Sequence, residues 1–293
     1  MKIAIQKLYA LIEKNCKHYS VQYLSSVYKV SRAGYYKWLK RKGTINSYQT
    51  MQRDLDLLIQ DIHQQNPTFG YHTTRDSLIL ETGWKVCDIS VWRSMKRLKI
   101  KGYIRKSKLP SSTGAEHVRY PNTLARSFKS RKPLEKLVTD ITYIKHKGKW
   151  NYLACFLDLY NNEIIEWELS AVLDNYLVIN PAKRLLEKTK STEHPKLLHS
   201  DQGIQYSSAG YSSLLKGYNV IQSMSRAGTP RDNAVMESFF GRFKDVLRVK
   251  FRYWQQEDLQ QTISDAITYF NKERPVRKLN GKTPVQYRIE LAL

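Results

Sequence analysis

The chain has few acidic residues, few cysteines and no long apolar run. It holds 26 Asp and Glu residues against 49 Lys and Arg in 293 residues, so its formal charge at pH 7 is +23. Because no run of about 18 apolar residues exists, we expect no membrane-spanning helix. Charged residues interrupt the N-terminal segment at Lys2, Lys7 and Glu13, which argues against the uninterrupted apolar core of a signal peptide.

The cysteines are too few and too scattered to build a structural site. Cys16, Cys87 and Cys155 are odd in number and lie far apart along the chain. That spacing provides no zinc motif, and it is typical of reduced thiols in a cytosolic protein.

The positive charge is the strongest compositional signal. A protein that neutralises phosphates releases condensed counterions, so an excess of this size favours binding to nucleic acid. A ribosomal or membrane-surface protein would share the signal and is the alternative. The hydrophobic content of 41% supports packed cores rather than disorder. The length suits two or three units.

Residues 1–43 are predicted to form three short helices. Ser20 and Ser31 stand where they can cap the second and third helix. The tight junction between those helices is typical of a helix-turn-helix, whose last helix would present basic residues such as Lys37 to DNA. A plain three-helix bundle with a solvated basic face is equally compatible with the pattern.

Residues 47–104 repeat this pattern and favour a second helix-turn-helix over a structural bundle. The pair Asn66 and Pro67 breaks the first helix and Gly83 ends the second, while Asp88 or Ser90 can cap the third. Periodicity places four residues of the third helix inward: Val91, Trp92, Met95 and Leu98. It places four cations outward, as candidate DNA contacts: Arg93, Lys96, Arg97 and Lys99.

Residues 105–133 are predicted to be a basic linker without a long element, because prolines, serines and a glycine interrupt any period. The segment is either a solvated tether or a tether that follows the DNA backbone.

Residues 134–250 are predicted to form three consecutive strands followed by alternating helices and strands, and residues 251–293 are predicted to form a helical tail. We therefore expect an α+β chain, in which helix-turn-helix modules precede an RNase H-like mixed-sheet α/β domain.

Three carboxylates are the candidate catalytic and metal-binding residues. Asp140 lies within an apolar strand, where an uncompensated charge is costly. Asp201 follows a short strand directly, and Glu237 begins a long helix. Phosphodiester cleavage needs charge neutralised on both the attacking and the leaving oxygen, which two Mg²⁺ ions about 3.5–4 Å apart provide through carboxylate ligands. Mn²⁺ is an alternative ion. We interpret Asp158 as a turn residue and Asp232 as a structural helix cap.

The surrounding segments carry a family resemblance. Residues 139–144, 199–206 and 232–240 read TDITYI, HSDQGIQY and DNAVMESFF. They resemble the three DDE motifs of the bacterial insertion sequence three family of transposases, including the 35 residues between Asp201 and Glu237. The resemblance also covers Lys244, which shares a helix face with Glu237 and could bind DNA phosphate.

The resemblance extends to the ends of the chain. Residues 19–38 and 68–98 look like the helical region of the family's second-reading-frame product, and the tail segments YFNKERP and LNGKTPVQY resemble its C-terminal signature. Leu137 and Val276 depart from the pattern, since many members carry tryptophan and histidine there. A retroviral integrase is disfavoured because the paired His and Cys spacing of its zinc module is absent.

The resemblance implies metal-dependent 3′-end cleavage of the element's DNA, followed by strand transfer into target DNA. It also implies DNA as partner, a homo-multimer in a synaptic complex, and a partner or fusion from an upstream reading frame. The expected location is the bacterial cytoplasm, in association with the nucleoid. Two alternatives remain open at this point. They are a non-catalytic DNA-binding regulator and a nuclease that cuts without joining.

Overall fold

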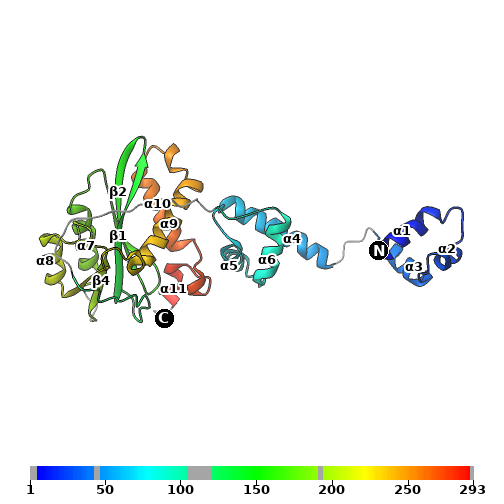
Figure 1. Cartoon of the computed structure of the whole chain (residues 1–293), viewed down its shortest axis with the longest axis horizontal. Helices are drawn as coiled ribbons and strands as arrows, with labels where there is room; N and C mark the ends of the chain where they lie inside the picture. The colour runs from blue at the N-terminus through cyan, green and yellow to red at the C-terminus, as the bar shows by residue number, and fades with distance from the viewer. Residues whose placement is uncertain (1–4, 43–46, 104–119, 191–193, 291–293) are drawn as a thin grey trace. The chain divides into compact units, whose positions relative to one another are not determined.

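The computed structural model describes residues 5–42, 47–103, 120–190 and 194–290. The chain divides into two compact units, residues 1–55 and residues 56–293. Figure 1 shows the elements of each unit in chain order. The N-terminal half of the expected linker, residues 105–119, lies outside the described residues.

The first unit contains three short helices, α1 (Ile5–Asn15), α2 (Val21–Val27) and α3 (Arg32–Arg41). Both expected caps are confirmed: the Ser20 side chain accepts from the Tyr23 N–H, and the Ser31 side chain accepts from the Gly34 N–H. The core of the unit is small, and each helix contributes to it. Its buried members are Ile12, Leu24 and Tyr35.

The helices α4 (Ser47–Gln65), α5 (Tyr71–Thr82) and α6 (Asp88–Arg97) follow. Gly83 ends α5 in the left-handed conformation, as expected. The expected cap of α6 is wrong, because Cys87 occupies the N-cap position and makes no side-chain capping bond. Trp92 was expected inward, but it is 46% exposed. Its ring instead stacks under the Lys96 ammonium, 5.0 Å away, and this cation–π contact stabilises an exposed indole.

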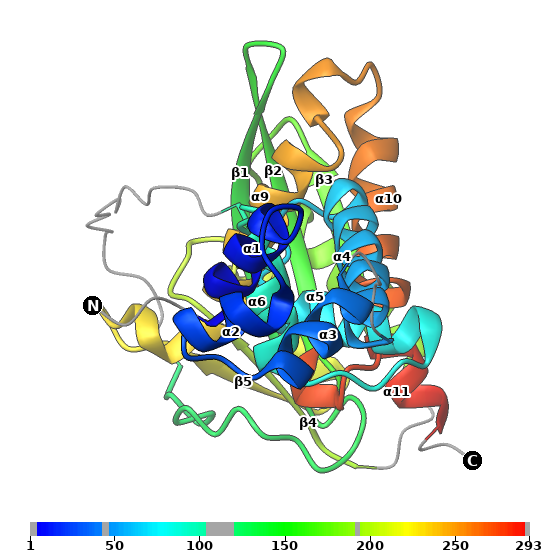
Figure 2. The same cartoon turned by 90° about the vertical axis from the view of Figure 1, so that its right-hand side faces the viewer.

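The catalytic-domain candidate is built on a five-stranded mixed sheet in the order β3-β2-β1-β4-β5. Its strands are β1 (Lys136–His146), β2 (Lys149–Asp158), β3 (Ile164–Ser170), β4 (Lys196–Ser200) and β5 (Val220–Met224). The first three are antiparallel, and β4 and β5 run parallel to β1. β1 pairs with β4 at residues 136–138 only. The β1–β2 hairpin therefore extends beyond the other strands, as Figure 2 shows.

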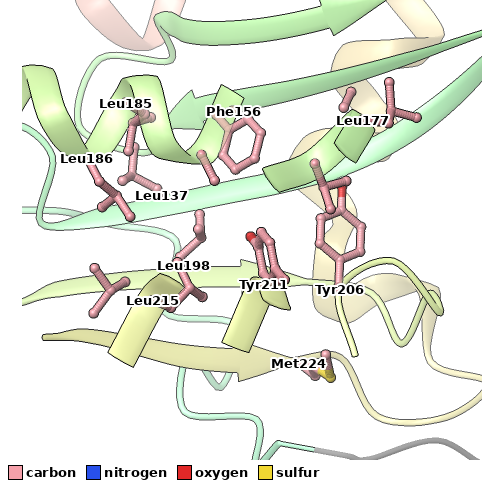
Figure 3. Packing of buried hydrophobic residues seen from close by; sticks show 14 residues of the cluster. Leu137, Phe156, Leu177, Leu185, Leu186, Leu198, Tyr206, Tyr211, Leu215 and Met224 are labelled. Carbon is pink, nitrogen blue, oxygen red and sulfur yellow. The ribbon is translucent and has the colours of Figure 1, made fainter. Parts of the chain in front are cut away.

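Helices cover both faces of this sheet (Figure 1). α7 (Tyr176–Lys188) and α8 (Ala209–Gly217) pack on one face. α7 runs through Pro181, which is buried against the sheet domain. Figure 3 shows the cluster between these helices and the strands, with Phe156 and Leu198 facing Leu185, Tyr211 and Leu215.

The opposite face carries α9 (Ala234–Val249) and α10 (Leu259–Lys272). The short 3₁₀ helices η1 (Pro230–Asn233) and η2 (Tyr253–Gln255) flank α9. The tail ends with η3 (Arg277–Leu279) and α11 (Pro284–Glu290). Three phenylalanines fasten α9 to α10, because Phe239 and Phe243 both contact the ring of Phe270.

Residues 120–133 contain no helix or strand but contact the sheet domain at several points. Leu124 is buried, and its N–H donates to the Ser223 hydroxyl. The Met224 N–H donates to the carbonyl of Pro121, and this bond holds the segment against the end of β5. In the part of the chain that the structure describes, no helix is both long and apolar enough to cross a membrane.

The buried ring of Phe156 is expected to be a main support of the core. Replacing Phe156 with alanine should lower the free energy of unfolding by about 3–5 kcal/mol, because it removes a fully buried aromatic side chain and leaves a cavity. Urea unfolding followed by circular dichroism measures this change. Val172 is exposed, so Val172→Ala should stay within about 0.5 kcal/mol of the wild type. Equal effects of the two substitutions would contradict the assigned core.

Candidate active site

Asp140 lies on the face of β1 that α9 covers. Leu137 and Ile141 belong to the cluster under α7 and α8, and alternate side chains of a strand point to opposite faces. The Asp140 carboxylate accepts a hydrogen bond from the N–H of Ile141 at 2.8 Å. Burial, and next the charge of Asp201, raises the pKa of Asp140 to about 8.

Asp201 follows β4 directly, at the carboxyl end of a parallel strand. Its Oδ1 accepts from the N–H of Gly203 at 2.9 Å. A Cβ at Gly203 would lie 2.9 Å from that same oxygen, so a side chain there would displace the carboxylate. Asp201 keeps access to solvent, yet the protein around it displaces enough water to raise its pKa.

Glu237 stands in the first turn of α9 and is exposed. Partial loss of hydration raises its pKa. The charge of Glu237 also raises the pKa of Asp140, while that of Lys244 lowers it. Asp140, Asp201, Glu237 and Lys244 therefore form one electrostatic neighbourhood, although they come from three distant segments.

The carboxylates fit a divalent cation by their chemistry, since Mg²⁺ prefers hard oxygen ligands. Asp140 in particular is a carboxylate with little water around it, and a cation would compensate its charge. Among the described residues, no three His, Cys, Asp or Glu side chains already converge at metal-binding distance.

Two residues that the motif analysis did not single out hold these segments in place. The Asn233 Nδ2 donates to the carbonyl of Thr139 at 3.1 Å, which joins the start of α9 to the residue before Asp140. The buried His199 ring bridges the hydroxyls of Ser223 and Ser225 at 2.9 and 3.1 Å, which fixes the end of β4 against β5. Burial lowers the pKa of His199 to about 4, so its ring is neutral at pH 7.

Asp232 is structural, as expected, but its expected role as a helix cap is wrong. Asp232 lies inside η1, and α9 begins after Asn233 without a side-chain capping bond. The Asp232 carboxylate is 0% exposed and accepts hydrogen bonds from Arg226, Arg126 and Asn122. It thus connects three segments: residues 120–126, the loop after β5, and the turn that leads to Glu237.

Asp158 is a turn residue, as expected. Its side chain accepts from the N–H groups of Tyr160 and Leu134. It lies at the end of β2 that pairs with Leu137, and it is buried. Burial raises the pKa of Asp158 to about 6.

The expected DNA contacts on the helical modules lie apart from the carboxylates in sequence and are exposed, whereas Lys244 is partly buried on α9. Lys37 lies on α3, and Arg93, Lys96 and Arg97 lie on α6. Arg97 donates two hydrogen bonds to Asp56, so that guanidinium also holds α6 against α4. Lys96 covers the Trp92 ring.

The chain matches known proteins over most of its length. Two models described as "Integrase core domain" match residues 130–230 and 218–284. A protein of Escherichia coli (strain K12), assigned as the transposase InsK of insertion sequence element IS150, is 33% identical over 92% of this chain and 94% of its own length. The chain belongs to the insertion sequence three family of transposases.

Other known proteins also match this chain. The transposase InsF for insertion sequence IS3A of Escherichia coli (strain K12) is 27% identical, over 95% of this chain and 97% of its own length. A transposase-like protein of Haemophilus influenzae is 37% identical over 70% of the chain and 94% of its own length. A solved magnesium complex of the HTLV-2 integrase catalytic core domain is 17% identical, with TM-score 0.44 over 53% of this chain and 96% of that one. The mixed sheet with helices on both faces and the two integrase core models confirm the RNase H-like fold class expected from the sequence. The transposase relatives confirm the expected DNA transposase function.

The ion pairs of Asp232 should make the stability of this transposase depend on acid pH. Hydrogen bonds from Arg226, and then from Arg126, hold the pKa of Asp232 well below its ordinary value of 3.8. A carboxyl with a lowered folded-state pKa stabilises the fold above its unfolded-state pKa, and this contribution is lost as the pH falls. The thermal midpoint of the wild type should therefore fall steeply between about pH 5 and pH 3.

Asp232→Asn should already have a lower midpoint at pH 7 and a flatter slope below pH 5. Differential scanning calorimetry across this pH range measures both quantities. A parallel pH dependence in the two proteins would show that Asp232 is not the group responsible.

Proposed function

We propose that Asp140, Asp201 and Glu237 are the catalytic carboxylates of this transposase and that they hold divalent metal ions, Mg²⁺ or Mn²⁺, as a pair. The observation that supports the proposal is the effect of Asp201, Glu237 and Lys244 on the pKa of one partly buried carboxylate, Asp140. When bound, the ions would neutralise charge on the attacking and leaving oxygens of the phosphodiester.

The protein's own residues prepare this site in three ways. Gly203 leaves room for the Asp201 carboxylate, as its close approach to Oδ1 requires. Asn233 holds the first turn of α9, and with it Glu237, against β1. The α9 helix places Lys244 two turns beyond Glu237, where its ammonium can bind a DNA phosphate beside the carboxylates.

The reaction proposed is 3′-end cleavage at the ends of the element, followed by attack of the new 3′-hydroxyl on a target phosphodiester. Phosphoryl transfer of this kind relies on positioning and charge stabilisation rather than on a covalent side chain. Lys37, Arg93, Lys96 and Arg97 are proposed to contact DNA through the helical modules. Bringing two ends together requires more than one copy, so we propose a homo-multimer, working with or fused to an upstream-frame product.

Asp201→Asn should reduce strand joining by roughly 10³-fold. Losing one anionic ligand removes several kcal/mol of transition-state stabilisation, and each 1.36 kcal/mol is tenfold in rate. The measurement uses labelled duplexes carrying the element's terminal repeats, with Mg²⁺ or Mn²⁺, and separates cut from joined strands on a denaturing gel.

Asp265→Asn is the matched control, because Asp265 is an exposed aspartate on α10 and should retain wild-type joining. Joined product at the wild-type level in Asp201→Asn would refute the assignment of Asp201. Metal-dependent cutting without any joined product in the wild type would identify a nuclease instead.

Lys244→Gln should weaken DNA binding and reduce its salt dependence. Removing one phosphate contact lowers the slope of log K against log salt concentration by about 0.9. Fluorescence anisotropy of a labelled duplex between about 50 and 200 mM salt gives this slope. Lys216 is exposed on α8, on the opposite face of the sheet, so Lys216→Gln should keep the wild-type slope. Equal slopes for wild type and Lys244→Gln would exclude a phosphate contact at Lys244.

A further inference from the structure

A concave surface of about 260 Å³ lies where the far part of the β1–β2 hairpin meets α9 and η2. We call it the hairpin pocket. The hairpin contributes Tyr143, Lys145 and Trp150, and α9 contributes Lys244 and Arg248. Tyr253 of η2 also lines the pocket. The His146 ring bonds the Gln256 carbonyl and Lys147 pairs with Glu257, which ties the hairpin to the segment after α9.

The aromatic side of the pocket is solvent-accessible. Tyr143 is 51% exposed and Trp150 is 53% exposed. Pairing of Tyr143 with Tyr152 and of Lys145 with Trp150 puts all four side chains on one face of the hairpin. The Tyr143 ring meets Trp150 edge-on at 6.5 Å and Tyr152 edge-on at 5.3 Å. The tyrosine is therefore held in place by aromatic contacts on both sides, beside an open indole.

The remaining lining is mainly cationic. The Lys145 ammonium lies 5.8 Å from the centre of the Trp150 ring. Lys244 and Arg248 are one helical turn apart on α9, so they point to the same side. Asp245 is the acid in the lining, against these three cations. Open π-faces suit a planar ring and the cations suit phosphate, and a nucleotide combines both features.

Helix α9 connects the pocket to the carboxylates. Lys244 is seven residues from Glu237 on α9, about 10 Å at roughly 1.5 Å per residue, and the two side chains share one face of the helix. Adjacent nucleotides of one DNA strand rise about 3.4 Å. A strand whose scissile phosphate lies at the carboxylates therefore reaches the pocket within a few nucleotides.

The size of the pocket limits its occupant. Pockets for whole small ligands usually measure about 300–1,000 Å³, and this one is smaller. It is large enough for one ring system that remains attached to a strand outside it. Enzymes whose chemistry is on a base take that base out of the stack into a pocket of this kind.

We propose that the hairpin pocket holds one unstacked nucleobase of the DNA strand near the cleavage site, with Trp150 as the stacking surface and Lys244 and Arg248 beside the flanking phosphates. The inference rests on the proposed function, since it takes that DNA as the ligand. It adds a base-holding site to the reaction and makes Trp150 a positioning residue for the strand.

Binding of two labelled 12-nucleotide single strands tests the pocket without any chemistry. One strand is oligothymidylate, and the other has the same backbone with an abasic residue at every position. Both are titrated by fluorescence anisotropy without divalent metal. One stacked base corresponds to a 5- to 150-fold gain in affinity, at roughly 1–3 kcal/mol per base. Wild type should therefore prefer the base-bearing strand by roughly tenfold or more.

Trp150→Ala should lose most of that preference, whereas Trp150→Phe should retain most of it because the ring is kept. Trp92→Ala is the matched control: Trp92 is also exposed and also lies under a lysine, but it is on α6, away from the pocket lining. An unchanged preference in Trp150→Ala overturns the proposal. So does an equal loss in Trp92→Ala, since bases would then bind elsewhere.

A second arm uses the element's terminal duplex with one abasic residue moved through the positions near the cleavage site. Trp150→Ala should lower strand joining on the intact end, but not on the end whose abasic residue occupies the pocket. Equal loss on every duplex contradicts a base bound in the pocket.

Failure of the wild type to join any end refutes the proposed function. The single-strand preference then still shows whether the pocket binds a base. A changed sedimentation coefficient with an unchanged preference would assign the surface to contact between copies.

Discussion

The cost of ionising a poorly hydrated carboxylate beside other acids is the constraint on which this site depends. Burial and the charge of Asp201 raise the pKa of Asp140 to about 8, so the ionised form of Asp140 carries a cost at neutral pH that a bound proton or a cation would offset. Among the described residues, the three carboxylates do not form a group at metal-binding distance. The site is better described as a set of acids held near one another than as a closed cage. The placement of these acids depends on the contacts that hold their backbone segments together.

Neutral and ionic contacts outside the carboxylates supply that support. Asn233 joins α9 to β1, His199 joins β4 to β5, and Asp232 binds two arginines from separate segments. Each of these three residues lies within a few sequence positions of Asp201 or Glu237. The enzyme therefore fixes the backbone positions of its acids through contacts outside the carboxylates themselves.

Much of this could be predicted from the sequence, because the informative patterns are local. Alternation along β1, the nearly continuous apolar run of β2 and the serine caps of α2 and α3 are each contained in a short stretch of sequence. The DDE motifs identified Asp140, Asp201 and Glu237 because each is embedded in a recognisable segment. Bonds between distant residues left no such pattern. Nothing near Arg126 indicates its bond to Asp232, and nothing near Asn233 indicates Thr139 as its acceptor. Trp92 misled the periodicity argument, since a lysine one turn away stabilises it on the surface.

The short pairing between β1 and β4 also affects how copies of this protein can meet. On that side of β1, no described strand pairs with it beyond Val138, which leaves a backbone edge of the kind that templates aggregation. Lys145, Lys147 and Lys149 crowd the end of the same hairpin. Two such edges approaching each other would bring like charges together at every attempt, so the hairpin remains extended and still resists self-association into a continuous sheet.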